Sequence, residues 1–555
     1  MGFINDFAAG LSGTVWGWPE VFPLMVAALL VTGLVMTVTL RFLQIRRLKH
    51  SLDVIRGKYD DPSHDGDLSH FQALTTALSA TIGIGNIAGV ATALHYGGPG
   101  ALFWMWVTAV FGMALKYAEC TLAIKHRVIL PDGSASGGPM YYIEKGLGSA
   151  WKPLAVAFAV CAVISSFGSG NSIQAFTVAD QIRSDLGVPT WITGLVSAGL
   201  VAAVILGGIK RIGAVTSKLV PYMAVIYVSG GLVVLFLNFS HIPGILAEIV
   251  TSAFKPAAQV GGFAGGTFIF MLTWGVKRGL FSNESGQGSA PIAHAAAKTD
   301  EPVREGVVAM MGPLIDTLII CSITGLVILS TGVWKEKMPD QVPLNAQSAI
   351  TVIAESARVL TDGVVRDADR FTGTVECKDG RPRGAFLVRN HAVVESPRLI
   401  EGDGTPFTGV LTVENGDVRT EGLPSLALAG DMPQNGSPLT AWAFRRGLSA
   451  FGNWGHLIVT IGVVLFGIST AISWSYYGDR AMVYLLGTSY VLPYKIVFVI
   501  MNFLGAVFSL EVVWNFGDSA LGLMSLPNLI ALVFLSRRVK GMSDDYFSRE
   551  HKPLR

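Results

Sequence analysis

Charge is what this sequence has least of. Only 14% of its 555 residues are Asp, Glu, Lys or Arg, and the formal net charge is +2. Soluble domains carry about 25% charged residues, so the composition excludes an ordinary soluble domain, and near-neutrality argues against a nucleic-acid-binding protein. Cysteine is also scarce, because four residues without a CxxC pair provide neither a disulfide framework nor a cysteine metal site.

The motifs of common enzyme classes are missing as well. The ten histidines form no HxxxH or HExxH pattern, and neither a GxSxG sequence nor a P-loop spacing occurs. The sequence therefore predicts a protein that is not an enzyme.

Long apolar runs are abundant. The mean hydropathy is +0.51, and runs near the ~20 residues that cross a bilayer recur along almost the whole chain. We expect an all-α polytopic membrane protein with about eleven transmembrane helices. Their approximate positions are 21–42, 73–94, 100–124, 154–173, 192–209, 215–238, 267–289, 303–333, 454–484, 493–510 and 513–535.

Basic residues predict the orientation of these helices. They cluster after odd-numbered spans, and loops rich in Lys and Arg stay in the cytoplasm. We therefore expect a multi-pass protein of a bacterial plasma (inner) membrane with its N-terminus outside and its C-terminus cytoplasmic. The basic residues in question are Arg41, Arg46, Arg47, Lys49, Lys125, Arg127, Lys210, Arg211, Lys298, Arg304, Arg537, Arg538 and Lys540.

One polar segment interrupts the apolar pattern between the eighth and ninth spans. Its alternating run FTGVLTVENGDVRTEG, with the hairpin signal Asn415-Gly416, predicts a small β-rich extracytoplasmic insert at 335–446. A lid or spacer without chemistry is favoured there over a substrate-capturing domain. The remaining units are a leader, first helix and cytoplasmic loop (1–70), a first five-helix repeat (71–260), the start and remainder of a second (261–334 and 447–540), and a cytoplasmic tail (541–555).

Two spans carry helix-breaking residues inside an apolar run. The second span contains Gly83-Ile84-Gly85-Asn86, and the seventh contains TWGVKRG at 273–279, followed by LFSNESG at 280–286. With the first span set aside, these two open successive sets of five, and interrupted helices at corresponding positions of inverted repeats point to a transporter's binding site. Close helix packing through small residues is the alternative explanation.

An unwound span can hold a zwitterion and a cation side by side. The freed N–H groups of Ile84 and Gly85 would bind a carboxylate. The carbonyls of Ser79 and Ile82 would bind a hard cation such as Na⁺, with hydroxyls supplied by the FGISTAISWSYYG segment. These hydroxyls belong to Ser469, Thr470 and Ser473, although such groups can also bond back to their own helix.

Three segments resemble signatures of the alanine or glycine:cation symporter family of the amino acid–polyamine–organocation superfamily. They are TIGIGNIAGVATALHYGGPGALFWMW, RGLFSNESGQGSAP and ISTAISWSYYGDR. The resemblance implies a leucine-transporter-like five-plus-five inverted repeat preceded by one extra helix. It also implies uptake of alanine or glycine with Na⁺ or H⁺. Ile84 and Ser285 depart from the family pattern, and the insert is longer than in compact members.

The resemblance also implies roles for particular residues. Asn86 would be an oxygen ligand near the substrate-side cation, together with the Thr81 carbonyl, and Thr273 is a further candidate. Gln174 would meet the substrate. Trp274 and Gly275 belong to the second predicted break.

Further polar and aromatic residues are candidates on their own chemistry. Asp316 could be a cation ligand, a proton site or a structural partner. Lys277 and Arg278 could pair with Glu284 or Asp316, or brace the fold. Phe176, Phe270 and Trp274 could wall the pocket, although aromatic residues in membrane spans more often serve packing.

The function we expect is Na⁺-coupled import of small neutral amino acids by alternating access, with Na⁺ as the coupling ion. The partners are then the alanine or glycine substrate and the lipid bilayer, with no nucleic acid and no obligate protein partner. A proton-coupled transporter, a channel and a non-transporting amino-acid sensor with the same fold remain alternatives.

Overall fold

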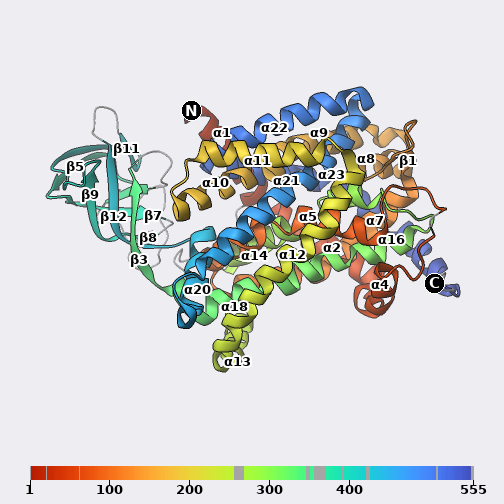
Figure 1. Ribbon diagram of the computed structural model, residues 1–555, viewed down its shortest axis with the longest axis horizontal. Coiled ribbons are helices and arrows are strands. Elements are labelled where there is room, and N and C mark those ends of the chain that lie inside the picture. The colour runs from red at the N-terminus through yellow and green to blue at the C-terminus, as the bar shows by residue number, and fades with distance from the viewer. Residues whose placement is uncertain are drawn as a thin grey trace.

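The computed structural model describes residues 2–19, 22–61, 63–255, 268–344, 350–354, 370–389, 392–419, 425–507 and 510–551. It shows a helical body with a separate β-sheet domain at one end (Figure 1). The predicted span starts at 21 and 267, and the predicted boundary at 260/261, lie outside these residues.

A helix lies at each of the eleven predicted positions. The helices are α1 (Gly2–Gly17), α2 (Leu24–Thr39), α3 (Leu43–Arg46), α4 (Leu48–Ile55), α5 (His70–Thr81), α6 (Ala88–Gly97), α7 (Pro99–His126), α8 (Pro139–Tyr142), α9 (Lys152–Phe167), α10 (Ile173–Leu186), α11 (Thr190–Ile205), α12 (Gly208–Leu237), α13 (Ile242–Ser252), α14 (Phe268–Asn283), α15 (Ala290–His294), α16 (Pro302–Ala309), α17 (Met311–Pro313), α18 (Ser322–Thr331), α20 (Gly436–Gly447), α21 (His456–Leu486), α22 (Val491–Val507) and α23 (Leu510–Ser548). The π-helical segments Gly168–Ser172 and Leu314–Cys321 join α9 to α10 and α17 to α18.

These helices form a multi-pass membrane body. Among the described residues, 7 helices are long and apolar enough to cross a membrane, or 8 if α5 and α6 count as one broken span. The helices α2 and α11 are shorter but apolar. The total of eleven crossings and the five-plus-five repeat therefore stay predictions.

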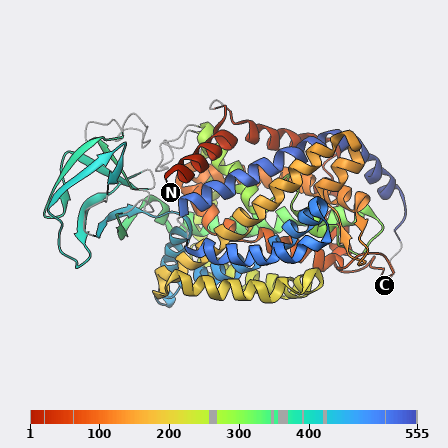
Figure 2. The same cartoon turned by 90° about the horizontal axis from the view of Figure 1, so that it is seen from above.

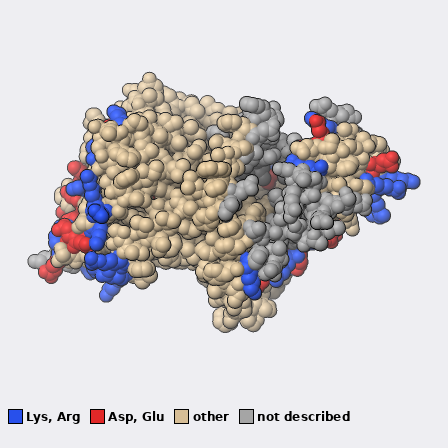
Figure 3. Space-filling view, turned by 180° about the vertical axis from the view of Figure 1, so that it is seen from behind, with Lys and Arg blue, Asp and Glu red and all other residues tan. Residues whose placement is uncertain are grey.

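The surface of the body supports a surrounding bilayer. Large apolar side chains are exposed along its helices, such as Val35 on α2, Leu195 on α11 and Val225 on α12, whereas a soluble monomer rarely exposes large apolar areas. Figure 3 shows a broad belt nearly without charged residues, and Lys and Arg gathered at the end away from the β-sheet domain.

The two ends of the chain lie at opposite ends of the body. Helix α1 begins beside the β-sheet domain, and the C-terminal part of α23 lies at the far end (Figures 1 and 2). If the β-sheet domain is extracytoplasmic, this arrangement places the N-terminus outside and the C-terminus inside, as the basic residues predict.

The predicted β-rich insert is a small domain with its own core. Its strands are β3 (Lys337–Pro343), β4 (Ile350–Ala354), β5 (Gly373–Lys378), β6 (Arg381–Pro382), β7 (Ala385–Arg389), β8 (Ala392–Val393), β9 (Glu395–Glu401), β10 (Gly409–Glu414), β11 (Asp417–Arg419) and β12 (Leu426–Pro433). They form antiparallel sheets in the orders β11-β10-β5-β6, β3-β12-β9 and β4-β7-β8. A short hairpin of β1 (Val128–Ile129) and β2 (Ala135–Ser136) lies outside this domain.

The hairpin signal in the insert is confirmed. Asn415 and Gly416 connect β10 to β11 with φ angles of 50° and 84°, which suits the left-handed turns that favour this residue pair. The predicted insert also extends beyond the strands, because α20 packs on α6, α18 and α21 of the helical body. The segment 335–446 therefore contains a β-sheet domain and a helix that covers the body.

A buried hydrogen-bonded cluster ties helices together at the other end of the body. Glu305 accepts hydrogen bonds from both His70 and His294, and the His294 Nδ1 to Glu305 Oε1 distance is 2.5 Å. Because the three residues lie on α5, α15 and α16 and are at most 1% exposed, the cluster holds the first turn of α5 against the segments that follow α14.

Candidate functional site

The second span is interrupted where the glycines predict it. Helix α5 ends at Thr81, a 3₁₀ turn covers Ile84–Asn86, and α6 begins at Ala88 at an angle of 60° to α5. The Gly83 N–H donates to Asn86 Oδ1 at 2.9 Å, so the asparagine side chain replaces a lost helical acceptor. The predicted interruption is confirmed, and residues 83–86 are all buried.

Near its end, α5 is joined to α21 by hydrogen bonds that involve three hydroxyl groups, one on α5 and two on α21. The Ser79 carbonyl accepts from Thr470 Oγ1 at 3.1 Å and from Ser469 Oγ at 3.4 Å, and Ser79 Oγ donates to the Ser469 carbonyl at 2.8 Å. The predicted ligands Ser79, Ser469 and Thr470 are therefore brought together. Serine and threonine hydroxyls with peptide carbonyls form an all-oxygen donor set, which fits Na⁺.

Because Gly83 has no side chain, Thr470 and Gln174 can lie close to the backbone of the break. A Cβ atom at this position would lie 2.6 Å from Thr470 Oγ1 and 3.3 Å from Gln174 Oε1. The carbonyls of the last turn of α5, which include the predicted ligands Thr81 and Ile82, have no further turn to bind them. The Thr81 hydroxyl donates back to Leu78 O at 3.3 Å, and the Thr81 carbonyl is the predicted ligand.

Ser473 lies one turn beyond Thr470 on α21. It is fully buried, and its Oγ has no hydrogen-bond partner among the described residues. The alternative that it bonds back to its own helix does not apply to Ser473, whereas Ser469 does donate to Phe466 O at 3.0 Å. Ser473 is thus a hydroxyl available to a ligand.

The predicted substrate side of the break is built around Gln174. The Ile84 N–H donates to Gln174 Oε1 at 3.4 Å, and Gln174 Nε2 donates to Ser169 O at 3.2 Å. Gly85 packs against α14, where its missing Cβ would lie 3.1 Å from Phe281 Cδ1. Phe176 follows Gln174 by two residues on α10 and so points away from the face that carries Gln174.

Asp316, for which the sequence allowed three roles, is the centre of a hydrogen-bond network. Its carboxylate accepts from Asn86 Nδ2 at 2.6 Å, Ser282 Oγ at 2.6 Å and Thr317 Oγ1 at 2.8 Å. Asp316 therefore connects the first break to the end of α14. It lies in the π-helical segment Leu314–Cys321, and such segments are frequent at functional sites.

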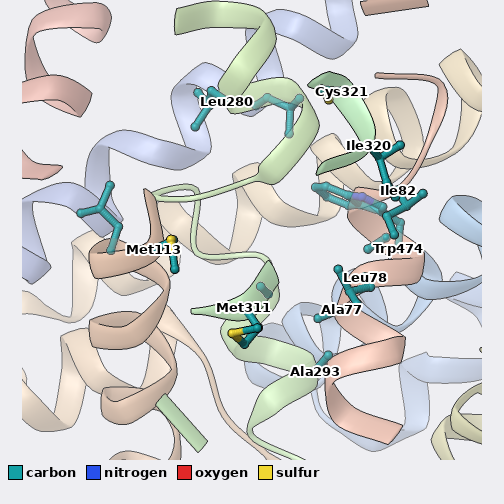
Figure 4. Close-up of a cluster of buried hydrophobic side chains, with 14 of the residues drawn as sticks. Ala77, Leu78, Ile82, Met113, Leu280, Ala293, Met311, Ile320, Cys321 and Trp474 are labelled. Atoms are coloured by element: carbon teal, nitrogen blue, oxygen red, sulfur yellow. The ribbon is translucent and has the colours of Figure 1, made fainter. Parts of the chain in front are cut away.

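Apolar side chains pack beside the first break. Ile82, Ile320 and Trp474, which come from three distant parts of the chain, gather beside the first break (Figure 4), and each is at most 2% exposed. Hydrogen bonds are stronger in such a low-dielectric surrounding than in water.

The predicted second break is wrong in position. Helix α14 runs without interruption from Phe268 to Asn283, so TWGVKRG at 273–279 is helical, and the chain unwinds at 284–289 before α15. Gly275 serves helix packing instead, because its Cβ would lie 2.6 Å from Trp104 Cβ and 2.7 Å from Ala101 O of α7. Left-handed φ angles at Glu284 (56°), Gly286 (82°) and Gly288 (81°) end the helix.

The true second interruption is held by a buried carboxylate. Glu284 Oε1 accepts from Trp474 Nε1 at 2.8 Å, and Oε2 accepts from Ser289 Oγ at 2.6 Å. Trp474 belongs to α21, next to Ser473, so one helix contacts both interruptions. The predicted stretch 280–286 reached the start of this interruption, and the pair of glycines in SGQG is the sequence signal for the rest of it.

Thr273, Trp274 and Gly275 lie on α14 toward the end of the body that carries the β-sheet domain. The Trp274 ring lies 4.4 Å from that of Tyr96, between centroids, and the Arg278 guanidinium carbon lies 5.1 Å from the Trp274 ring. Thr273 Oγ1 is buried and has no hydrogen-bond partner among the described residues.

Helix α20 covers the site from the side of the β-sheet domain. Thr440 Oγ1 donates to Ile87 O at 3.1 Å, and Asn435 Nδ2 donates to Tyr96 OH at 3.4 Å. Both acceptors belong to the region around the first break and α6, so α20 closes that end of the site.

A polar cavity of about 360 Å³ lies at the opposite end of α21. Asp479 is its central charge, 2.6 Å from Arg480 Nε and 3.6 Å from Lys495 Nζ. Asp67 and Tyr476 also line this cavity. Because Asp479 follows Ser473 by fewer than two helical turns, the cavity begins near the hydroxyls of the candidate cation site.

Comparison with known proteins identifies relatives over almost the whole chain. A sequence model of the Sodium:alanine symporter family matches residues 1–363 and 425–554. The Sodium/alanine symporter AgcS of Methanococcus maripaludis is 42% identical over 524 residues, which are 94% of this chain and 92% of that protein. The Putative sodium/proton-dependent alanine carrier protein YrbD of Bacillus subtilis is 31% identical over 554 residues, 99% of this chain and 94% of that protein.

Among solved structures, a crystal structure of MhsT in complex with L-phenylalanine has a TM-score of 0.49 at 10% identity and covers 85% of this chain and 90% of that chain. The residues that the family model leaves unmatched, 364–424, fall within the β-sheet domain.

Proposed function

Because the chain belongs to the sodium:alanine symporter family, we propose that this transporter imports alanine or glycine together with Na⁺ by alternating access across the plasma membrane. The observation that carries the proposal is the convergence of Thr470 and Ser469 on the Ser79 carbonyl at the end of α5. A ten-helix core of two inverted five-helix repeats, preceded by α2, is part of the same proposal.

Na⁺ would bind where α5 loses its helical hydrogen bonds. The Ser79, Thr81 and Ile82 carbonyls and the Ser469 and Thr470 hydroxyls would hold it. The interactions that these groups now make with one another would be exchanged for interactions with the ion, so binding would order the α5–α21 contact.

The amino acid would bind on the other side of the break. The Ile84 and Gly85 N–H groups would bind its carboxylate, because N–H groups at the start of a helical turn favour anions. Gln174 would release the Ile84 N–H and orient the substrate. The present hydrogen bond between them is long, at 3.4 Å, so little is lost when it breaks. Asn86 and Thr273 are the further polar groups proposed for this site, and Trp274 and Gly275 form part of its wall on α14.

Alternating access would follow from the two interruptions. Glu284 and Trp474 connect the second interruption to α21, and Asp316 connects the first to α14. Rocking of these segments against their surroundings would open the α20 side or the Asp479 cavity in turn. Each ligand would lower the cost of ordering the break for the other, which is the physical basis of coupling.

Proton coupling is the second candidate, and the buried carboxylate of Asp316 is the observation that favours it. A group that binds and releases one proton per cycle could substitute for Na⁺. The experiment below distinguishes the two coupling ions.

We expect Na⁺ and alanine to tighten each other's binding by the same factor. Typical coupling is about 5- to 150-fold, and the reciprocity is a thermodynamic requirement for two ligands that order one segment. The measurement is calorimetric binding of alanine at several Na⁺ concentrations and of Na⁺ at several alanine concentrations. Counterflow of labelled alanine in proteoliposomes, with and without a Na⁺ gradient, tests transport. Alanine binding that ignores Na⁺ but responds to pH would favour the proton.

Removal of the β-sheet domain is expected to leave transport intact. Lys337 and Pro433 are paired at the base of β3 and β12, so a short Gly/Ser linker from Glu336 to Gln434 can replace 337–433. The anchoring ion pair between Arg446 and Glu336, at 2.6 Å, and helix α20 remain in place. We expect the KM for alanine uptake to change less than about twofold, since the domain has its own core and none of its described residues belongs to the proposed site. A tenfold rise in KM would instead show that the domain captures substrate.

A further inference from the structure

A basic cavity opens at the end of the body opposite the β-sheet domain. It has a volume of about 230 Å³ and lies between the turn that follows α2 and the C-terminal part of α23. Its charged lining residues are Arg41, Arg46, Arg47, Lys540 and Asp544. The excess of cations over carboxylates marks it as a site for an anion.

The cations of this cavity are not neutralised by the protein. Among the described residues, no carboxylate lies within 4.0 Å of the charged groups of Arg41, Arg46, Arg47 or Lys540. Arg46 Nη1 donates to the Arg41 carbonyl at 3.3 Å, and the Arg47 guanidinium stacks 4.0 Å from the Phe547 ring centroid. These contacts orient two guanidinium groups without satisfying their charge.

The cavity lies at the level where the lipid-facing surface ends. On α2 the exposed apolar side chains end at Val38, and Arg41 follows in the turn directly after the helix. On α23, Val533 and Phe534 are exposed and Lys540 follows. The phosphate layer of a bilayer lies directly outside its hydrocarbon core, and therefore beside the cavity.

Apolar side chains flank the cations on the outer surface. Phe42 is 51% exposed and Ile45 is 63% exposed, and both lie in the segment that lines the cavity. Arg41 and Phe42 also adopt left-handed φ angles of 55° and 56°, an arrangement that is uncommon for non-glycine residues and is concentrated at functional sites. A ligand with an anionic head and acyl chains matches this combination of charge and apolar surface.

We propose that this cavity binds the phosphate headgroup of an anionic phospholipid, with its acyl chains along α2 and α23. The Arg41, Arg46 and Lys540 side chains would contact the phosphate, and Arg47, held by Phe547, would complete the positive lining. The site is separate from the proposed substrate and Na⁺ sites. Basic pockets between membrane helices are suited to such headgroups, and the volume admits a phosphate group with several waters.

The test is thermal unfolding of the purified full-length protein in detergent, titrated with phosphatidylglycerol or with phosphatidylcholine of equal chain length. A ligand that binds only the folded state raises the melting temperature with its concentration. The test variant is Arg41→Gln/Arg46→Gln/Arg47→Gln. The matched control is Lys49→Gln/Lys125→Gln/Arg537→Gln, which removes the same charge from exposed residues that do not line the cavity. The single variant Lys540→Gln serves if the triple variant does not fold.

We expect phosphatidylglycerol, and not phosphatidylcholine, to stabilise the natural protein and the control. The test variant should bind phosphatidylglycerol at least tenfold more weakly. Equal stabilisation of test and control variants, or equal stabilisation by both lipids, would overturn the proposal. If inorganic phosphate alone reproduces the whole shift, the cavity binds a free anion and the lipid assignment is wrong.

Discussion

Replacing Gly83 with alanine is expected to abolish Na⁺-dependent alanine uptake while the protein still folds. The new Cβ would lie 2.6 Å from Thr470 Oγ1 and 3.3 Å from Gln174 Oε1, so both groups must move. Overpacking of this kind costs about 1–3 kcal/mol, and here it displaces one proposed Na⁺ ligand and one proposed substrate ligand together. We expect the apparent Na⁺ affinity to fall at least about tenfold and uptake to fall below about 1%, measured in proteoliposomes.

Gly89→Ala is the matched control for this prediction. It adds the same atom to the same interrupted span, but the nearest atom to its Cβ is Arg278 Cδ at 3.8 Å, an ordinary contact. Uptake should remain within about twofold of the natural protein, because alanine is also a better helix former than glycine. If the two variants lost uptake equally, any added methyl group in this span would impair transport, and the result would not support a place for Gly83 in the proposed site.

Asp316→Asn is expected to produce the second large loss of transport. Three donors converge on this carboxylate, from Asn86, Ser282 and Thr317, and an amide nitrogen cannot accept from them. Loss of buried hydrogen bonds to a charged group costs about 1.5–3 kcal/mol, equivalent to about 10- to 150-fold. We expect alanine uptake to fall by at least about 100-fold, since the network joins the first break to α14, and thermal unfolding to shift by only a few degrees.

Thr317→Val provides the comparison for Asp316. It removes the hydroxyl that donates to Asp316 Oδ2 and accepts from Asn283 Nδ2 at 3.1 Å, but it keeps the carboxylate and the side-chain shape. Uptake should fall by less than about tenfold. If Asp316→Asn transports normally, Asp316 is not a coupling group, and its connection of the first interruption to the end of α14 is not needed for transport.

The two predicted interruptions show what local sequence can and cannot predict about a break in a membrane helix. Gly83, Gly85 and Asn86 were identified correctly because three poor helix formers in four residues leave the backbone without helical partners. Gly275 and Gly279 carry the same local signal, yet they lie in a continuous helix where they admit α7 to close contact. A glycine within a membrane span can therefore mark a break or a packing surface, and only the neighbouring helix decides which.

The role of a polar residue within a membrane span likewise depends on its neighbours in the fold, and Asp316 is an example. The sequence placed one carboxylate in an apolar run and left its role open among three possibilities. Its partners are Asn86, 230 residues away in the chain, and Ser282, 34 residues away, and no spacing rule connects such positions. The hydroxyls of Ser469 and Thr470 do contact the Ser79 carbonyl at the end of α5, and their role as cation ligands stays a prediction.

The amino-acid sequence by itself determined that this is a multi-pass membrane protein, that its second span is interrupted, and that a β-rich segment separates two groups of helices. These properties follow from composition and from the conformational preferences of neighbouring residues. Tertiary structure alone decided where the second interruption lies and that Asp316 connects the first interruption to the end of α14. It also decided that four cations line one cavity without an ion-pair partner among the described residues. Each of these depends on contacts between residues far apart in the chain, and such contacts are set by the packing of whole helices.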